Sequence, residues 1–167
     1  MMIYCTVTSN QYISLAIALA KSIKQADPKA KVLMCLIEED YSYACPYLGY
    51  FDHVILAKDL GFSNFYRYIF KHNAYEASGS CKARLMLYAF KHFSNEDKFV
   101  FLDSDMKVFG PFDEINEDLN YQSIILSPHI LKKGILEHFY LVGIFNSGFF
   151  ALKKSDEAYR FLNWWAD

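Results

Sequence analysis

The sequence is organised around residues 99–109, which read FVFLDSDMKVF. The unbroken apolar run at 99–102 predicts a strand that is covered on both faces, as strands of parallel sheets are. Two carboxylates, Asp103 and Asp105, follow the strand at once. Ligands of open α/β sheets bind outside the carboxyl ends of the strands, so we expect this pair at a ligand site.

The spacing of the two carboxylates indicates a cation as the ligand. Residues i and i+2 of an extended chain point the same way, so Asp103 and Asp105 could converge on one ion. Carboxylate oxygens suit Mg²⁺ or Mn²⁺, and Mg²⁺ commonly shares such sites with substrate phosphates. The alternative reading is structural, with Asp103 opening a turn and Asp105 solvated.

Length and composition predict one domain over residues 1–167, with 53% hydrophobic residues and a formal net charge of −2. The mixed charges give no electrostatic case for nucleic acid or a membrane surface. The sequence shows neither a transmembrane run nor a signal peptide, so we expect a soluble, cytoplasmic protein. The four cysteines lack the C-x-x-C spacing of zinc or thioredoxin sites, and Cys5 and Cys35 read as core residues in a reducing compartment.

The first 38 residues predict a βαβ unit with a right-handed crossover. Strands are expected at 3–7 and 31–38, with a nearly all-apolar helix between them that runs through about Lys24. Ser9 or Asn10 could cap this helix. The loop after the first strand lacks glycine, which argues against a dinucleotide fingerprint and hence against NAD; it could also be an ordinary capped loop.

The middle of the chain predicts a short helix at 41–48, a strand at 53–56 and a helix at 81–93. Residues 64–73 could form a helix or a lid, in which Arg67, Lys71 and His72 meet phosphate or form a solvated face. Lys82 and Arg84 fall in the first turn of the helix at 81–93, where cations oppose the helix dipole. Either an anion binds at that helix start, or both side chains extend to water.

The remaining chain predicts two further strands, at 123–126 and 145–152, and two helices. Residues 106–109 are expected to continue extended before a turn at Gly110-Pro111. An acidic helix or turn follows at 112–119, residues 130–142 look like a variable loop, and Ser155 caps a final helix at 156–165. Asn146 and Ser147 lie at the entry of the last strand, where they could bind a hydroxylated ligand or simply form a turn.

Together these motifs resemble the GT-A-type glycosyltransferases that use nucleotide sugars, in bacterial families of and around the family 8 type. The resemblance rests on five segments spread over nearly the whole chain: TSNQY at 8–12, KARL at 82–85, FLDSD at 101–105, LSPH at 126–129 and FNSG at 145–148. It implies a GT-A, Rossmann-like α/β fold with a mostly parallel twisted sheet flanked by helices.

The resemblance also implies the members of the site. The residues that would bind the donor nucleotide sugar are Thr8, Asn10, Tyr12, Lys82, Arg84, Ser104, Asn146 and Ser147. The ligands that would hold Mn²⁺ or Mg²⁺ on the diphosphate are Asp103 and Asp105. No single carboxylate stands out as a catalytic base, so the resemblance assigns no catalytic residue.

The implied function is metal-dependent transfer of a sugar from a nucleoside-diphosphate sugar, with UDP favoured, to a carbohydrate or glycoconjugate acceptor. Synthesis of a surface polysaccharide or glycoconjugate is the expected role. Relatives continue beyond the last helix, so we expect the N-terminal portion of a longer catalytic domain, with little turnover alone. Trp164 and Trp165 should leave an exposed apolar patch or bury it in a dimer.

Two other functions fit parts of the sequence. Haloacid-dehalogenase-type phosphatases also end an apolar strand in D-x-D, but they place it in the first strand as part of the motif D-x-D-x-T. Here nearly 100 residues precede the motif, and Lys107 stands at the Thr position. The other alternative is a non-catalytic domain that binds sugar nucleotides.

Overall fold

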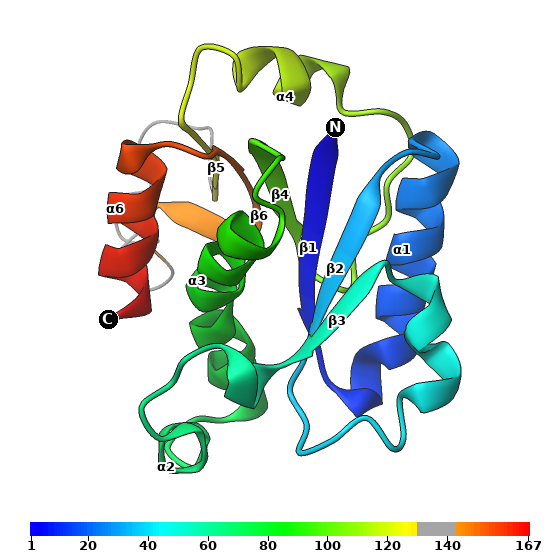
Figure 1. The fold of residues 1–167 in the computed structure, drawn as a ribbon, viewed down its shortest axis with the longest axis vertical. Coiled ribbons are helices and arrows are strands. Elements are labelled where there is room, and N and C mark those ends of the chain that lie inside the picture. The colour runs from blue at the N-terminus through cyan, green and yellow to red at the C-terminus, as the bar shows by residue number, and fades with distance from the viewer. Residues whose placement is uncertain (130–142) are drawn as a thin grey trace.

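The computed structural model describes residues 1–129 and 143–167, which form one six-stranded sheet with helices packed against it (Figure 1). The strand order is β3-β2-β1-β4-β6-β5. The strands are β1 (Met2–Thr8), β2 (Lys31–Leu36), β3 (His53–Leu56), β4 (Lys98–Leu102), β5 (Ile124–Pro128) and β6 (Phe145–Lys153). The variable loop expected at 130–142 lies outside the described residues.

The sheet is mostly parallel, as predicted. β1 pairs in parallel with both β2 and β4, and β2 pairs in parallel with β3. β6 is antiparallel to both of its neighbours, β4 and β5. The central strand β4 therefore has a parallel neighbour on one side and an antiparallel neighbour on the other, and Asp103 follows its carboxyl end.

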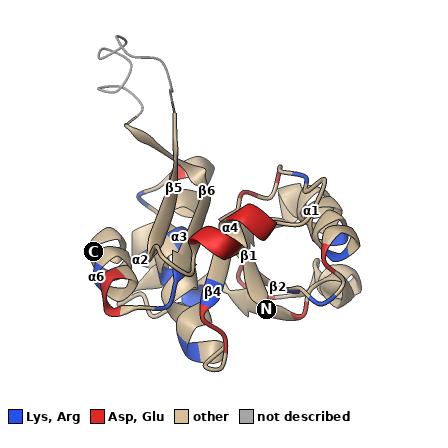
Figure 2. Cartoon of the chain, turned by 90° about the horizontal axis from the view of Figure 1, so that it is seen from above, with Lys and Arg blue, Asp and Glu red and all other residues tan. Residues whose placement is uncertain are grey.

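Helices cover both faces of the sheet (Figure 1). The helices are α1 (Ile13–Ala26), α2 (Phe65–Ile69), α3 (Ala74–His92), α4 (Asp113–Asp118) and α6 (Asp156–Ala166), with 3-10 turns η1 (Asn10–Tyr12), η2 (Cys45–Tyr50) and η3 (Ala57–Asp59). α1 packs on one face, whereas α3 and α6 pack on the other. The acidic helix α4 lies across one end of the molecule (Figure 2).

The two faces follow from the alternation of side chains along fully buried strands. In β1, Ile3 and Cys5 contribute to the core under α3 and α6, whereas Met2 and Tyr4 contribute to the core under α1. Cys5 and Cys35 are buried, as expected of core residues. Burial raises the pKa of both thiols, so both stay protonated at neutral pH.

Three local predictions in the first half of the molecule and after β4 are wrong. Neither Ser9 nor Asn10 caps α1, because the 3-10 turn η1 intervenes and Tyr12 takes the cap position. The helix expected at 41–48 is replaced by η2, which has a proline at its start. Residues 106–109 do not extend β4, because the chain turns directly after Leu102.

The start of α3 differs from the prediction by seven residues. The Asn73 side chain accepts a hydrogen bond from the Glu76 N–H at 2.9 Å, and the Glu76 carboxylate accepts one from the Asn73 N–H at 2.9 Å. This capping box satisfies two N–H groups at the true helix start. Lys82 and Arg84 consequently lie more than two turns inside α3, so the placement in a first turn, on which both the anion site and the solvated alternative rested, is wrong.

The last helix agrees with the prediction. Ser155 caps α6 by accepting a hydrogen bond from the Ala158 N–H at 3.2 Å. Trp164 is 74% exposed, as expected, whereas Trp165 is half-buried and packs edge-on against Phe150 with ring centroids 5.2 Å apart. A dimer through this helix stays a prediction. Among the helices of residues 1–129 and 143–167, none combines the length and apolar character needed to cross a bilayer.

The capping box gives a test of where α3 begins. Asn73→Ala should lower the free energy of unfolding in urea by about 1 kcal/mol, because the Glu76 N–H loses its acceptor. Ser80 would be the cap of a helix that began at Cys81, but in the structure it lies within α3. Ser80→Ala should therefore change stability by less than about 0.5 kcal/mol. A larger loss for Ser80→Ala than for Asn73→Ala would contradict the assigned helix start.

Candidate functional site

A cavity of about 940 Å³ opens at the carboxyl ends of β1, β2 and β4. Thr8 ends β1, Ile37 follows β2, and the residues 103–105 follow β4; all of them line the cavity. The first turns of α3 form the opposite wall, and Trp165 of α6 also contributes. This is the edge of an α/β sheet where ligands bind, and the volume is in the range of small-molecule sites.

Most of the predicted site residues are brought together in this cavity. The residues that line it are Thr8, Tyr12, Lys82, Asp103, Ser104, Asp105 and Ser147. The predicted residues that do not line it are Asn10, Arg84 and Asn146. The cavity therefore joins segments from β1, α3, β4 and β6 that are far apart in the sequence.

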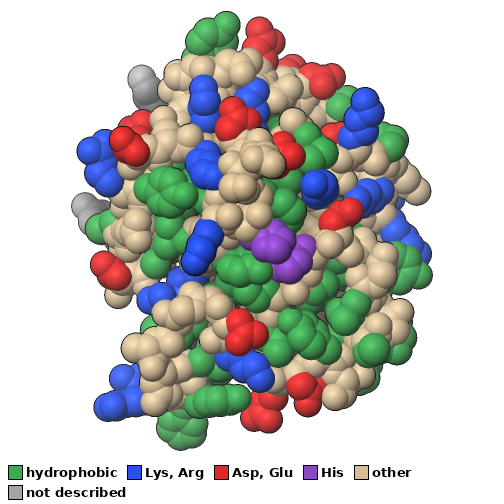
Figure 3. Space-filling model, in the orientation of Figure 1, with side chains coloured by type: hydrophobic (Ala, Val, Ile, Leu, Met, Phe, Trp, Pro, Cys, Tyr) green, Lys and Arg blue, Asp and Glu red, His purple; other side chains and the backbone are tan. Residues whose placement is uncertain are grey.

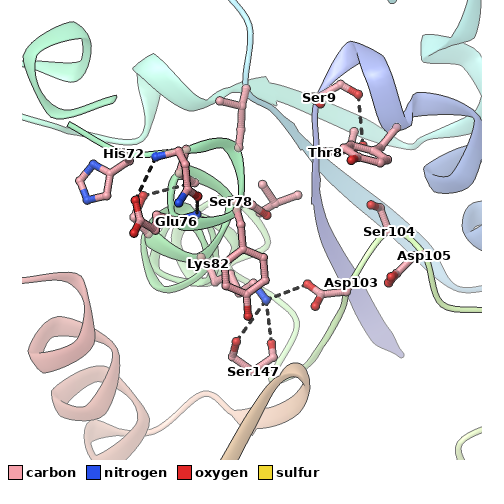
Figure 4. A pocket seen from close by; sticks show the side chains of 18 of the residues that line it. Thr8, Ser9, His72, Glu76, Ser78, Lys82, Asp103, Ser104, Asp105 and Ser147 are labelled. Atoms are coloured by element: carbon pink, nitrogen blue, oxygen red, sulfur yellow. Dashed lines mark hydrogen bonds and ion pairs between the residues drawn. The ribbon is translucent and has the colours of Figure 1, made fainter. Parts of the chain in front are cut away.

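The Lys82 ammonium group is the centre of the polar contacts in the cavity (Figure 4). Lys82 is only 5% exposed, and its Nζ lies 2.7 Å from the Asp103 Oδ1. It also donates to the Ser147 backbone oxygen at 3.1 Å and to the Ser147 hydroxyl at 3.2 Å. A charge this buried needs such partners, since an unpaired ion in the interior is strongly unfavourable.

The two carboxylates lie in a turn and not on an extended strand. The Met106 N–H donates to the Asp103 carbonyl oxygen at 3.0 Å, which closes a four-residue turn. The premise that an extended chain aligns the two side chains is therefore wrong. The Asp103 carboxylate faces Lys82, whereas Asp105 lies beside Ser104, farther from Lys82 (Figure 4). Their sharing of one cation stays a prediction.

A bulge in β6 brings its first residues to the end of β4. Between β5 and β6 the register changes: β5 advances by one residue from Leu126 to Ser127, while β6 moves four residues from Phe150 to Asn146. The extra residues on β6 bend toward β4, where the Asp103 N–H donates to the Gly148 carbonyl oxygen at 2.8 Å. This bend places Ser147 in the cavity.

Gly148 is required at this close approach. A Cβ atom there would lie 2.8 Å from the Asn146 Oδ1 and 2.9 Å from the Asp103 Oδ2. The Asn146 side chain is engaged within its own strand, where its Oδ1 accepts from the Gly148 N–H at 2.6 Å. Asn146 therefore shapes the strand entry beside Asp103 and does not itself line the cavity.

Arg84 joins distant parts of the chain outside the cavity. Its guanidinium donates to the Ala166 carbonyl oxygen at 3.0 Å and to the Gly61 carbonyl oxygen at 3.3 Å. The same group lies over the Phe62 ring, 4.5 Å from the ring centroid. These contacts fix α3 against the end of α6 and the loop before α2, so the structure gives Arg84 a packing role.

The loop between β1 and α1 is held by a residue that the sequence reasoning missed. The Asn10 N–H donates to the Glu38 Oε1 at 2.8 Å, which ties this loop to the chain after β2. The Asn10 Oδ1 is buried and accepts no hydrogen bond from residues 1–129 or 143–167. The loop is therefore fixed through its backbone, while Tyr12 is 47% exposed beside the cavity.

The start of α3 supplies further cavity residues that were not predicted. They are Asn73, Tyr75, Glu76, Ala77, Ser78, Gly79 and Ser80. His72, which the sequence offered as a phosphate contact or part of a solvated face, lines the cavity just before them. The N-x-x-E pattern at 73–76 was the available signal, since it marks a capping box. Reading it would have placed these residues on the helix that carries Lys82.

Asp103 and Asp105 fit a hard cation by their chemistry. Carboxylate oxygens are the ligands that Mg²⁺ and Mn²⁺ prefer. Asp105 is exposed and forms no ion pair or side-chain hydrogen bond with the described residues, so its oxygens face the cavity unoccupied by protein donors. Among residues 1–129 and 143–167, no group of three or more His, Cys, Asp or Glu side chains could hold a metal ion. Water and ligand oxygens would therefore have to complete the coordination shell.

Comparison of the sequence with protein-family models and with curated proteins gave no match. Comparison of the structure with solved structures gave several matches to glycosyltransferases. The galactosyltransferase LgtC, solved with donor and acceptor sugar analogues, is 14% identical with a TM-score of 0.59 over 99% of this chain. The glycosyltransferase GlyE of Streptococcus pneumoniae TIGR4 is 18% identical with a TM-score of 0.56 over 97% of this chain.

A third match is the core-mannan synthase CmsA of Aspergillus fumigatus, solved in a Mn/GDP form, at 9% identity and a TM-score of 0.54 over 97% of this chain. The chain spans 63% of the LgtC and CmsA chains and 36% of the GlyE chain. At such identities the likeness shows the fold alone. The GT-A-type fold implied by the sequence motifs is thereby confirmed.

Gly148 gives a test of the geometry beside Asp103. Gly148→Ala should lower the free energy of unfolding by about 1–3 kcal/mol, because the added methyl group overlaps oxygens of Asp103 and Asn146. At Gly110 a Cβ would meet no atom within 4 Å, so Gly110→Ala is the matched control and should change stability by less than about 0.5 kcal/mol. Equal effects of the two substitutions, measured by urea unfolding, would contradict the close packing at Gly148.

Proposed function

We propose that this chain binds a nucleoside-diphosphate sugar in the cavity and belongs to a metal-dependent glycosyltransferase. The observation that carries the proposal is the turn of Asp103 and Asp105, which opens on a cavity of suitable size in a GT-A-type fold. Two of the matched proteins were solved with ligands of this kind, LgtC with sugar analogues and CmsA with manganese and GDP.

The nucleotide is proposed to lie along the loop between β1 and α1. Thr8 and Tyr12 line this side of the cavity, and Tyr12 is exposed enough to stack on a flat base. The backbone of the loop is tied to Glu38, so little ordering is needed when a ligand binds. Asn10 supports this loop through its backbone N–H, and its buried side chain does not line the cavity.

The diphosphate is proposed to lie at the turn after β4. A bound Mg²⁺ or Mn²⁺ would supply Lewis-acid stabilisation of the charge that grows on the departing nucleoside diphosphate. Asp105 contributes a carboxylate that faces the cavity, and Asp103 contributes one that Lys82 holds in place. Lys82 thus positions Asp103, and Ser147 places its hydroxyl at the side where the sugar would lie.

Glycosyl transfer passes through an oxocarbenium-like transition state. The residues described here would bind the donor and orient its leaving group, which favours cleavage of the bond between sugar and phosphate. We propose a carbohydrate or glycoconjugate as the acceptor, UDP as the nucleotide, and a role in surface polysaccharide or glycoconjugate synthesis in the cytoplasm. The acceptor, the nucleotide, the biological role and the location are proposed for the whole protein to which this chain belongs.

Thermal unfolding with nucleotide sugars tests the proposal. UDP- or GDP-sugars should raise the melting temperature, and Mn²⁺ should increase the shift. Asp103→Asn and Asp105→Asn should each weaken the Mn²⁺-dependent part of donor binding at least about tenfold, because each removes a ligand oxygen charge. Asp118→Asn, on the exposed acidic helix at the other end of the molecule, is the matched control and should bind the donor normally.

The outcomes separate the readings of the sequence. Normal Mn²⁺-dependent binding by both Asp103→Asn and Asp105→Asn would defeat the proposed metal site. Stabilisation by nucleotide sugars would support the donor-binding half of the proposal, whether or not donor hydrolysis or sugar transfer accompanies it. Absence of any shift with every nucleotide sugar would defeat the proposed function itself.

A further inference from the structure

An exposed surface of mixed aromatic and basic side chains lies around α2, and the proposed function does not use it. We call it the α2 surface; its residues are Tyr66, Arg67, Phe70, Lys71 and Tyr75. Tyr66 is 57% exposed, Phe70 92% and Tyr75 86%. Arg67 and Lys71 are exposed as well. Three large rings so close together in the sequence are seldom left in water without a partner.

The sequence of α2 explains why these side chains face outward. Phe65 is buried and packs edge-on against Phe62 with ring centroids 5.5 Å apart, which fixes the inner side of the helix. Tyr66 and Phe70 are four residues apart and therefore lie on one outer ridge. The Phe70 N–H donates to the Tyr66 carbonyl oxygen at 3.0 Å, so the helical geometry holds across this spacing. The rings are thus presented by ordered backbone.

The basic pair lies on the neighbouring ridge. Arg67 and Lys71 are also four residues apart. Residues 60–75 contain no Asp or Glu, although the whole chain has a net charge of −2. In the space-filling view, hydrophobic, basic and some acidic side chains lie together at the end of the molecule where Figure 1 places α2 (Figure 3). Glu76, next to Tyr75, is exposed and its carboxylate accepts a hydrogen bond from the Asn73 N–H. Arg67 and Lys71 outnumber it, so the α2 surface keeps a small positive excess that complements an anionic partner.

We propose that the α2 surface docks on an anionic lipid bilayer. Exposed aromatic rings favour the interfacial region of a membrane, and neighbouring Lys and Arg side chains pair with anionic headgroups. The rings of Phe70 and Tyr75 stand outward and are almost fully exposed, which suits insertion into a soft interface. The net charge of the chain did not indicate membrane binding, because carboxylates elsewhere in the chain offset the charges of Arg67 and Lys71.

Docking in this way would bring the cavity to the membrane. Ile69, His72 and Tyr75 belong to the same segment and line the cavity. The cavity mouth would therefore face the lipid surface, and the acceptor would be a lipid-linked or otherwise membrane-held glycan. This last step rests on the proposed function, whereas the docking itself does not.

Sedimentation with lipid vesicles tests the docking. The full chain should bind phosphatidylcholine vesicles that contain phosphatidylglycerol, more weakly as salt rises, and bind pure phosphatidylcholine far less. Replacing Arg67 and Lys71 together, as Arg67→Gln and Lys71→Gln, should weaken binding about 25-fold, at about fivefold for each cation. Tyr66→Ser with Phe70→Ser should also reduce binding at least tenfold, because both rings leave the interface.

Two matched controls carry the same chemical changes elsewhere. Lys29→Gln with Lys91→Gln removes two exposed cations outside the α2 surface and should leave vesicle binding unchanged. Phe109→Ser removes a ring that is 90% exposed in the segment between β4 and α4, outside the α2 surface. It should also bind vesicles like the unsubstituted chain.

Three results would overturn the proposal. The first is equal binding to neutral and anionic vesicles, and the second is an equal loss of binding in the α2 and control variants. The third is a chain that does not bind vesicles but binds a soluble polysaccharide through Tyr66 and Phe70. Melting temperatures with nucleotide sugars, measured on the same variants, keep the two proposals apart. Vesicle binding without any nucleotide effect would defeat the proposed function and leave the docking standing.

Discussion

The ion pair between the buried Lys82 ammonium and the partly exposed Asp103 carboxylate is the contact on which the site depends. The lysine ammonium has three N–H donors, and three acceptors surround it: the Asp103 carboxylate and the two oxygens of Ser147. One cation thereby joins the middle of α3, the end of β4 and the entry of β6. Loss of any partner would leave the buried Lys82 charge without full compensation. Because an unpaired charge in the interior is strongly unfavourable, this requirement holds the three elements together.

This pairing gives the two carboxylates of the motif different surroundings. Asp103 is held on one oxygen by Lys82, while Asp105 is exposed and has no protein partner among the described residues. A paired carboxylate next to an unpaired one suits a ligand whose own oxygens complete the coordination, because only part of the shell is held in place before binding.

The strands were accessible from the sequence, because apolar runs bounded by polar residues mark buried strands clearly, whereas their order in the sheet was not predicted. The strand at 53–56 was predicted with its observed bounds. The start of α3 was missed because Ser78-Gly79-Ser80 suggested a helix boundary, while the capping box at Asn73 outweighs a single glycine inside the helix. The turn after Leu102 and the bulge in β6 depend on pairing with distant strands, which no local pattern records.

The same limit applies to the site. The resemblance placed Lys82 among the donor-binding residues, and the structure brings its side chain into the cavity. The sequence left either an anion or water as the partner of Lys82, whereas the structure pairs it with Asp103. Arg84 is two residues away on the same helix, yet it points to Gly61 and Ala166, because a helix turns by about 200° over two residues. Whether a cation on a helix faces a cavity or a neighbouring element is decided by packing, which sequence spacing alone does not fix.

The place of β6 in the sheet also determines when the cavity can form as the chain folds. β1 meets β2 through the pair Ile3 and Lys31, whereas its pairing with β4 joins Ile3 to Phe99, and Lys82 reaches Ser147 across 65 residues. Long loops must lose entropy before their contacts form, so the early βαβ unit can assemble well ahead of the β4–β6 ladder. The ligand pocket thus depends on contacts of long sequence separation, and a bound ligand would stabilise only those molecules that have completed the whole topology.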